Sequence, residues 1–185
     1  MKAVLAAAAA LLFAGCASLS GSIAPSSPFD LLGRVLAGAD GRAFSAGFRW
    51  RHDTQSNEIW LMSPTGTTLA YISSDAAGAT LVTADQQEYR AFSTESLTRQ
   101  ALGWALPLAQ LQHWVRGEAV PDVVADTVER DAGGRLIRLE QAGWSLNFAY
   151  SEAPAPAALP RRLDLEQGSQ RIRMVIDDWR ERAPQ

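Results

Sequence analysis

The sequence predicts a mainly β protein, a single antiparallel sheet of about 10 to 11 strands with a helical insert. Three observations lead to this fold class. Apolar and polar residues alternate from residue 29 onward, and turn residues recur about every 10 positions. In residues 93–118 the alternation stops and the apolar spacing becomes helical. A sheet of this size usually curls, so with helices over one face it would enclose an apolar space.

The first 15 residues are predicted to be a cleaved signal peptide. Lys2 precedes an apolar run over residues 3–14, and small residues follow. The run is shorter than the roughly 20 residues that a membrane-spanning helix needs. Residues 16–28 are rich in Ser, Gly and Pro, and we expect a flexible tether there that spans about 20 Å on average. The remaining residues, 29–183, are predicted to form one domain.

Cys16 is the single cysteine of the chain, so it cannot form an internal disulfide. Ala14-Gly15-Cys16 resembles a bacterial lipobox, in which the thiol is lipidated and cleavage leaves the cysteine as the new N-terminus. The alternative is an incidental cysteine at the end of the signal peptide. Two or more acyl chains anchor a protein stably, so lipidation predicts a domain tethered close to a membrane.

The first half of the domain is predicted to be an antiparallel meander. In residues 43–52, Phe44, Ala46, Phe48 and Trp50 share one face, which indicates a half-buried strand. Asp40-Gly41 is a suitable hairpin turn into that strand. Further strands are expected over residues 57–63, 67–73 and 79–85.

Two helices are expected in the central stretch. Ser93 or Thr94 can cap the first, and Pro107 can open the second, where its missing N–H costs nothing. Leu108, Leu111, Trp114 and Val115 would form the apolar face of the second helix. The sheet's apolar face is the place where both helices can be buried.

Strands resume after the helices. Residues 131–134 form a turn signal, and residues 135–141 and 144–150 can pair across Ala142-Gly143. Residues 151–160 form a Pro/Ala-rich loop, after which residues 161–167 and 170–179 can pair across Gly168-Ser169. Alternation places Trp144, Leu146, Phe148 and Tyr150 on one face.

Composition and motifs exclude several functions. A formal net charge of -3 argues against nucleic-acid binding, and no phosphate-binding glycine motif is present. His52 and His113 lack neighbouring ligands at metal spacing, and no serine lies in a GxSxG context. Asp177 and Asp178 are adjacent on a strand, so they point to opposite faces. We therefore expect no enzyme activity, no metal and no cofactor.

Several stretches, in this order, resemble the outer-membrane lipoprotein receptor LolB family. They are "GRV…FSAGFRW", "LMSPTGTTLA", "LGWALPLAQLQHWVRGE" and "QRIRMVIDDW", preceded by Cys16, and together they cover nearly the whole chain. The resemblance implies an unclosed antiparallel β half-barrel with a helical lid over a hydrophobic cavity. It also implies a protein anchored by its lipid on the periplasmic face of the outer membrane.

The resemblance implies a function in lipoprotein sorting. A periplasmic carrier similar to LolA would hand over an acylated lipoprotein, and the receptor would release it into the inner leaflet of the outer membrane. We expect a monomer. Members of the family often carry an exposed leucine between the proline and glycine of one loop, where this chain has Pro64, Thr65 and Gly66. The candidate cavity residues are Phe48, Trp50, Leu102, Leu111, Trp114, Leu146 and Phe148.

Two other functions remain open from the residues alone. The first is a lipid-anchored periplasmic sensor or binding module on a related half-barrel, which would bind a partner without relaying cargo. The second is a cell-envelope hydrolase, for which the sequence offers no nucleophile–base or paired-acid arrangement.

Overall fold

The computed structural model describes residues 27–151 and 159–181. The predicted signal peptide, Cys16 and the tether up to residue 26 lie outside the described residues, as do the side chains of Leu102 and Glu181.

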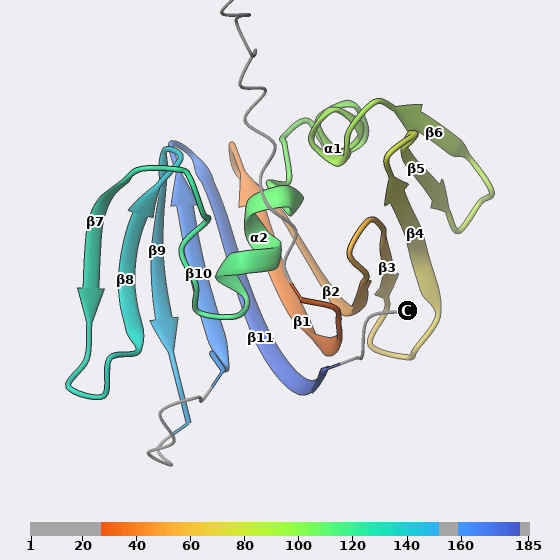
Figure 1. The fold of residues 1–185 in the computed structure, drawn as a ribbon. Coiled ribbons are helices and arrows are strands. Elements are labelled where there is room, and N and C mark those ends of the chain that lie inside the picture. Colours follow the sequence, from red (N-terminus) through yellow and green to blue (C-terminus); the bar gives the residue numbers. More distant parts are fainter. Residues whose placement is uncertain (1–26, 152–158, 182–185) are drawn as a thin grey trace, which may run out of the picture.

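The described residues form one antiparallel sheet of 11 strands that curls around two short helices (Figure 1). This confirms the predicted mainly β, unclosed architecture. The strands and helices are β1 (Phe29–Ala39), β2 (Arg42–His52), β3 (Asn57–Met62), β4 (Thr68–Asp75), β5 (Gly78–Thr83), β6 (Glu88–Ala91), α1 (Thr94–Leu102), α2 (Leu108–Trp114), β7 (Ala125–Arg130), β8 (Leu136–Gln141), β9 (Trp144–Ala149), β10 (Arg162–Gln167) and β11 (Gln170–Glu181).

The strand order is β6-β5-β4-β3-β2-β1-β11-β10-β9-β8-β7, so the first and last strands meet at the centre. The backbone of Phe29 pairs with that of Glu181 on one side and that of His52 on the other. We call β1–β6 the first wing and β7–β11 the second wing. β6 and β7 are the two outer edges, and they do not pair with each other.

The alternation read from the sequence matches burial strand by strand. Ala46, Phe48 and Trp50 are buried in β2, and the residues between them are partly exposed. The predicted turn at Asp40-Gly41 forms, with φ of 49° and 78°, values that a two-residue hairpin turn requires. β6 and β7 were not among the strands that the sequence predicted. Both are edge strands, and neither carries a buried residue in its pattern.

The two helices begin and end near the predicted residues. Ser93 caps α1 by accepting a hydrogen bond from the backbone N–H of Ser96, and Gly103 ends the helix with φ 83°. Pro107 precedes α2, which has no side-chain cap and depends on packing.

The two helices occupy different places on the sheet. α1 contacts β5 and β6, and α2 lies between the two wings (Figure 1). Trp114 of α2 is completely buried, with its ring centroid 6.4 Å from that of Trp144 in β9. The core is therefore continuous from one wing to the other, with α2 at its centre.

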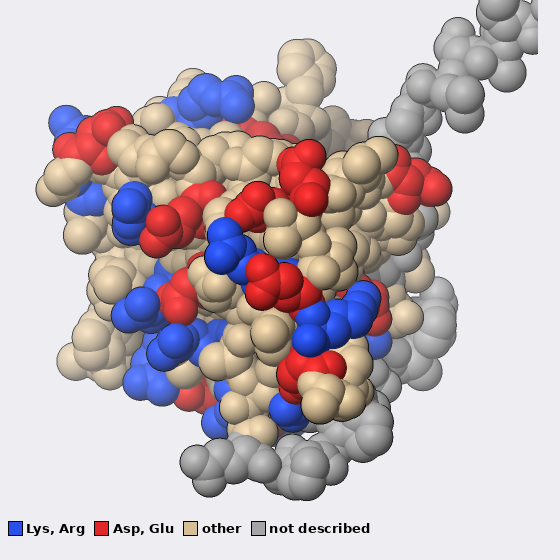
Figure 2. All heavy atoms as spheres, turned by 90° about the vertical axis from the view of Figure 1, so that its left-hand side faces the viewer, with Lys and Arg blue, Asp and Glu red and all other residues tan. Residues whose placement is uncertain are grey.

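The outer face of the second wing carries charges of both signs in alternation (Figure 2). Many of them are paired, for example Arg138 with Glu140 at 2.8 Å and Arg162 with Asp164 at 3.0 Å. A surface of this kind creates no field of a single sign over this face.

Candidate functional site

An apolar cavity lies beneath the helices, on the inner face of the first wing and of the adjoining strand β11. Inward residues of β1 to β4 and β11 form its floor, and the helical segment forms its roof. Thr98 is the one polar residue in the lining. The lining residues are Val35, Ala37, Phe44, Phe48, Trp50, Ile59, Leu61, Ile72, Thr98, Trp104, Leu106, Leu108, Leu111, Ile172 and Met174.

The cavity is small in this structure, about 70 Å³. Pockets that hold drug-sized ligands usually measure about 300–1,000 Å³, so this space holds about two water molecules and no long ligand. A long hydrocarbon chain would therefore need a wider space than this structure shows.

The floor of the cavity is rigid around Trp50. Its indole N–H donates to Asn57 Oδ1 at 2.9 Å, and its ring meets Phe29 edge to face with centroids 4.9 Å apart. The polar end of Trp50 is thus satisfied away from the cavity, and the apolar rings of Trp50 and Phe48 face it.

One half of the roof is fixed by a buried glutamine. Gln141 in β8 is 1% exposed, and its Oε1 accepts hydrogen bonds from Trp114 Nε1 at 3.1 Å and from the backbone N–H of Val120 at 2.8 Å. Its Nε2 donates to the backbone carbonyls of Val120 and Val123. These four bonds tie α2 and the chain that follows it to the second wing.

The other half of the roof consists of α1 and the segment that follows it. We call this segment, residues 103–107, the strap. Trp104 and Leu106 of the strap are half-buried and line the cavity. The backbone N–H of Leu106 donates to Thr98 Oγ1 at 2.8 Å, which joins the strap to α1.

The structure brings together three of the seven candidate cavity residues. Phe48, Trp50 and Leu111 line the cavity. Trp114, Leu146 and Phe148 are buried in the core but do not line it, because α2 fills the space above the second wing. The side chain of Leu102 lies outside the described part of the chain.

Sequence reasoning missed Ala37 and Ile72, and it missed the strap residues Trp104 and Leu106. Ala37 and Ile72 could have been found from alternation, which places them on the same sheet face as Phe48. The strap has no such signal, since it follows neither the strand nor the helix period.

The loop with Pro64, Thr65 and Gly66 is exposed and joins β3 to β4. Its backbone closes on itself, with the N–H of Ser63 donating to the carbonyl of Thr67 at 2.8 Å. The hydroxyl of Thr65 lies 2.8 Å from that of Ser63, so the tip is polar and internally hydrogen-bonded.

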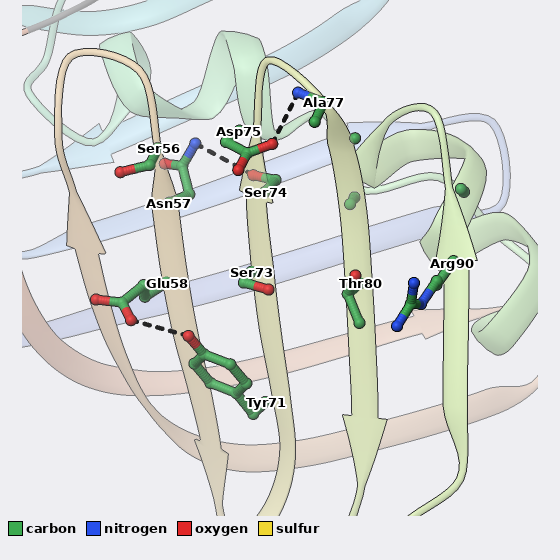
Figure 3. Close-up of a pocket in the computed structure, with 13 residues that line it drawn as sticks. Ser56, Asn57, Glu58, Tyr71, Ser73, Ser74, Asp75, Ala77, Thr80 and Arg90 are labelled. Atoms are coloured by element: carbon green, nitrogen blue, oxygen red, sulfur yellow. Dashed lines mark hydrogen bonds between the residues drawn. The ribbon is translucent and has the colours of Figure 1, made fainter.

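A second hollow lies on the outer face of β3 to β6 and is polar (Figure 3). Its volume is about 470 Å³, and it is open to solvent. The Tyr71 hydroxyl donates to Glu58 Oε1 at 2.8 Å. Two causes raise the pKa of Tyr71: its partial burial, which is the larger, and this hydrogen bond. The open shape and the charges of Glu58, Asp75 and Arg90 make this hollow unsuitable for a hydrocarbon chain.

Within residues 27–151 and 159–181, His, Cys, Asp and Glu form no group of three or more that could hold a metal ion. The same residues contain no helix of the length and hydropathy needed to span a membrane.

Comparison with known proteins places the chain in a family. The family model described as "Outer membrane lipoprotein LolB" matches residues 27–179. An outer-membrane lipoprotein LolB of Nitrosomonas europaea is 40% identical over 154 residues, which cover 82% of this chain and 72% of the relative. The LolB protein of Chromobacterium violaceum is 36% identical over 97% of this chain and 99% of its own length.

Among solved structures, a LolA superfamily protein from Nitrosomonas europaea has a similar fold. Its TM-score is 0.51 at 9% sequence identity, covering 89% of this chain and 90% of that protein. The structural likeness supports the half-barrel architecture, and the family assignment follows from the sequence relatives. The chain belongs to the outer-membrane lipoprotein LolB family.

Proposed function

We propose that this protein accepts acylated lipoproteins from a LolA-like periplasmic carrier, holds their acyl chains in the apolar cavity, and releases them into the inner leaflet of the outer membrane. The observation that carries the proposal is the cavity between α1, α2 and the first wing, whose lining is apolar apart from Thr98. Its family places the chain among outer-membrane lipoproteins and transport proteins, outside the enzymes.

The energetics explain why a receptor is needed. Exposing one sixteen-carbon acyl chain to water costs on the order of 10 kcal/mol, at about 0.8 kcal/mol per CH2. Free diffusion of a triacylated lipoprotein through the periplasm is therefore negligible. A protein cavity offsets much of this cost but less than a bilayer does, so transfer from carrier to receptor to membrane can run downhill without nucleotide hydrolysis.

The polar groups of the site support holding rather than reacting. Thr98 is the one hydroxyl in the lining, and it is already bonded to the backbone of Thr94 and Leu106. The lining therefore offers a hydrocarbon chain dispersion contacts and no nucleophile or acid.

The remaining parts of the proposal concern the anchor and the exposed loop. Cys16, lipidated, would anchor the monomeric protein to the outer membrane, and the loop at Pro64, Thr65 and Gly66 would face the membrane during release. Thr65 buries less apolar area than the leucine that the family often has there, so release through this loop should be slower in this chain.

A transfer assay tests the proposal. The carrier is loaded with a triacylated lipoprotein and mixed with the Cys16→Ala protein, which has no anchor of its own. We expect the cargo to move from the carrier to this protein. If the folded Cys16→Ala protein binds the carrier but takes no cargo, the chain acts as a binding module and the proposal is wrong.

A further inference from the structure

Two apolar side chains protrude into solvent from the outer edges of the sheet. Phe92 is 100% exposed and Val124 is 86% exposed, which makes them the two most exposed large apolar residues in the described part of the chain. Phe92 directly follows β6, and Val124 directly precedes β7. Because β6 and β7 are the two outer strands, each wing carries one of these residues at its edge. We call Phe92 and Val124 the rim pair.

The exposure of Phe92 breaks a local packing rule. Ser93 is the N-cap of α1, so Phe92 occupies the position before the cap, where an apolar residue often packs against the fourth residue of the helix. That fourth residue is Leu97, which is completely buried. A fully exposed ring cannot cover Leu97, so Phe92 adds nothing to the packing of the helix start. Positions that break a local rule without a packing gain are expected at functional sites.

The backbone holds both residues of the rim pair in place. Phe92 lies between the last residue of β6 and the N-cap Ser93, whose side chain accepts a hydrogen bond from the first turn of α1. Next to Val124, the carbonyl of Val123 accepts a 2.7 Å hydrogen bond from Gln141 Nε2. The exposure of the two side chains is therefore a property of the fold.

The rim pair lies on the side of the molecule where the helical segment begins and ends. The end of β6 and the start of β7 are both at the upper side of Figure 1, one on each wing. Residues 93–123 join them and include α1, the strap and α2, which form the roof of the cavity. The loop over residues 64–66 lies elsewhere, because it precedes β4, whereas the turn after β4 lies beside Phe92. The length of β4, 8 residues or about 26 Å, separates the two sites.

A lipid bilayer suits this arrangement better than a protein partner does. A stable protein interface buries about 800 Å² per partner over a continuous surface, whereas the rim pair is two separate points on two wings. A bilayer needs no complementary shape, and its interface accepts single apolar side chains among polar neighbours. Arg90 and Glu88, the charged residues of β6, pair with each other at 2.6 Å and so supply little attraction for charged lipids. The family places the chain among outer-membrane lipoproteins, which work at a membrane surface.

We propose that the rim pair is a membrane-contact site, in which Phe92 and Val124 enter the boundary between the headgroups and the acyl chains of a phospholipid leaflet. Phe92 supplies most of the contact, because its ring buries more apolar area than the side chain of Val124. The attraction is apolar, so it should be insensitive to salt and to the charge of the lipid. This inference rests on the proposed function and adds to it a second membrane contact, on the side of the roof.

Single-cysteine labelling tests which side of the domain meets the membrane. Cys16 is the only cysteine, so the mature chain from residue 16 with Cys16→Ala takes one environment-sensitive fluorophore at any introduced cysteine. On addition of phosphatidylethanolamine–phosphatidylcholine vesicles, the emission of labelled Phe92→Cys should shift to shorter wavelength. Labelled Leu36→Cys, at a 49% exposed apolar position of β1, should not shift. Equal shifts at the two positions, or none at Phe92→Cys, would overturn the proposal.

Vesicle sedimentation measures the contribution of each side chain. Phe92→Ser should lower the partition coefficient into the same vesicles about tenfold, and Val124→Ser should lower it severalfold. Phe92→Trp keeps an apolar ring and should bind as the parent does. Leu36→Ser is the matched control, because it removes an exposed apolar side chain elsewhere, and it should leave binding unchanged. All these variants should keep the urea midpoint of the parent, since the changed side chains lie outside the core.

The outcomes separate this site from the proposed function. If the parent does not bind vesicles, or if Phe92→Ser binds them as the parent does, the membrane-contact site is wrong, whether or not cargo moves from the carrier. If Phe92→Ser keeps vesicle binding but loses uptake from the carrier, the rim pair is a carrier-docking surface and the proposal is wrong. A parent that binds vesicles through Phe92 but takes no cargo would keep the membrane contact and refute the proposed function.

Discussion

Gln141 and Trp114 are joined in the centre of the molecule by a 3.1 Å hydrogen bond from the indole N–H to the amide oxygen. The bond connects β8 to α2, and the same amide satisfies three backbone groups of residues 120 and 123. A single side chain thus fixes α2 and the chain that follows it, the half of the roof that is tied to the second wing.

Replacing this amide should destabilise the whole domain. Gln141→Leu leaves two donors and two carbonyls without partners in the core, and we expect the free energy of unfolding to fall by about 3 kcal/mol. Urea denaturation measures it. Gln167→Leu is the control, since Gln167 makes a 3.3 Å bond at an exposed turn and should change stability by less than about 0.5 kcal/mol. Equal effects of the two changes would contradict the anchoring role of Gln141.

Filling the cavity should block ligand binding without unfolding the protein. Ala37 and Ala46 are both buried in the β1–β2 hairpin, but Ala37 alone lines the cavity. Each Ala→Leu change should cost about 1–3 kcal/mol through overpacking. We expect Ala37→Leu to weaken binding of fluorescent hexadecanoic acid at least tenfold and Ala46→Leu to change it less than twofold. Similar affinities for both variants would place the ligand elsewhere.

A more apolar loop tip should speed release into membranes. Thr65→Leu removes a hydroxyl that lies against Ser63 at an exposed site. It adds apolar surface that a bilayer can bury, and this burial lowers the free energy of contact with the membrane by up to about 2 kcal/mol. We expect transfer of a bound acylated lipoprotein into phospholipid vesicles to become several-fold faster, with uptake from the carrier unchanged. Gln87→Leu, in the exposed β5–β6 turn, controls for added hydrophobicity. A Gln87→Leu effect as large as that of Thr65→Leu would argue against a specific role for the loop.

The contribution of the Arg34–Asp177 pair to stability should depend on pH and be lost in acid. Arg34 donates to Asp177 at 2.8 and 3.1 Å, and these bonds lower the pKa of the Asp177 carboxyl. A lowered pKa means that the pair stabilises the fold above the unfolded pKa of about 3.9. This stabilisation is lost as the pH falls through the lower folded-state value.

Urea midpoints at neutral and acidic pH test this dependence. The urea midpoint of the parent should exceed that of Asp177→Asn at pH 7, and the difference should shrink as the pH falls below the unfolded pKa of the carboxyl. Asp40→Asn, at the exposed β1–β2 turn, should leave the profile unchanged. A gap between parent and Asp177→Asn that stays constant with pH would contradict the prediction.

The sequence predicted most strands because a half-buried strand leaves a period of two, as in Phe48 and Trp50. It missed β6 and β7, which lie at the sheet edges. Neither strand has a buried residue, so neither shows an alternation of apolar and polar residues that sequence analysis could detect. For the cavity, alternation grouped the residues that share a face but could not say which face lies inside or which wing α2 would fill. The position of α2 depends on the long-range hydrogen bond between Trp114 and Gln141. A glutamine within an alternating strand gives no indication in the sequence that it will form such a bond.

Placing the first strand against the last has a consequence for when the protein becomes active. Phe29 finds its neighbour across the β1–β11 junction only after nearly the entire polypeptide is available for folding. Ile172 and Met174 of β11 complete the cavity floor, so a partly exported chain has no finished compartment. Pairing across such a separation is slow to form, so under the proposed function a chain could hold lipid only after β11 has joined the sheet.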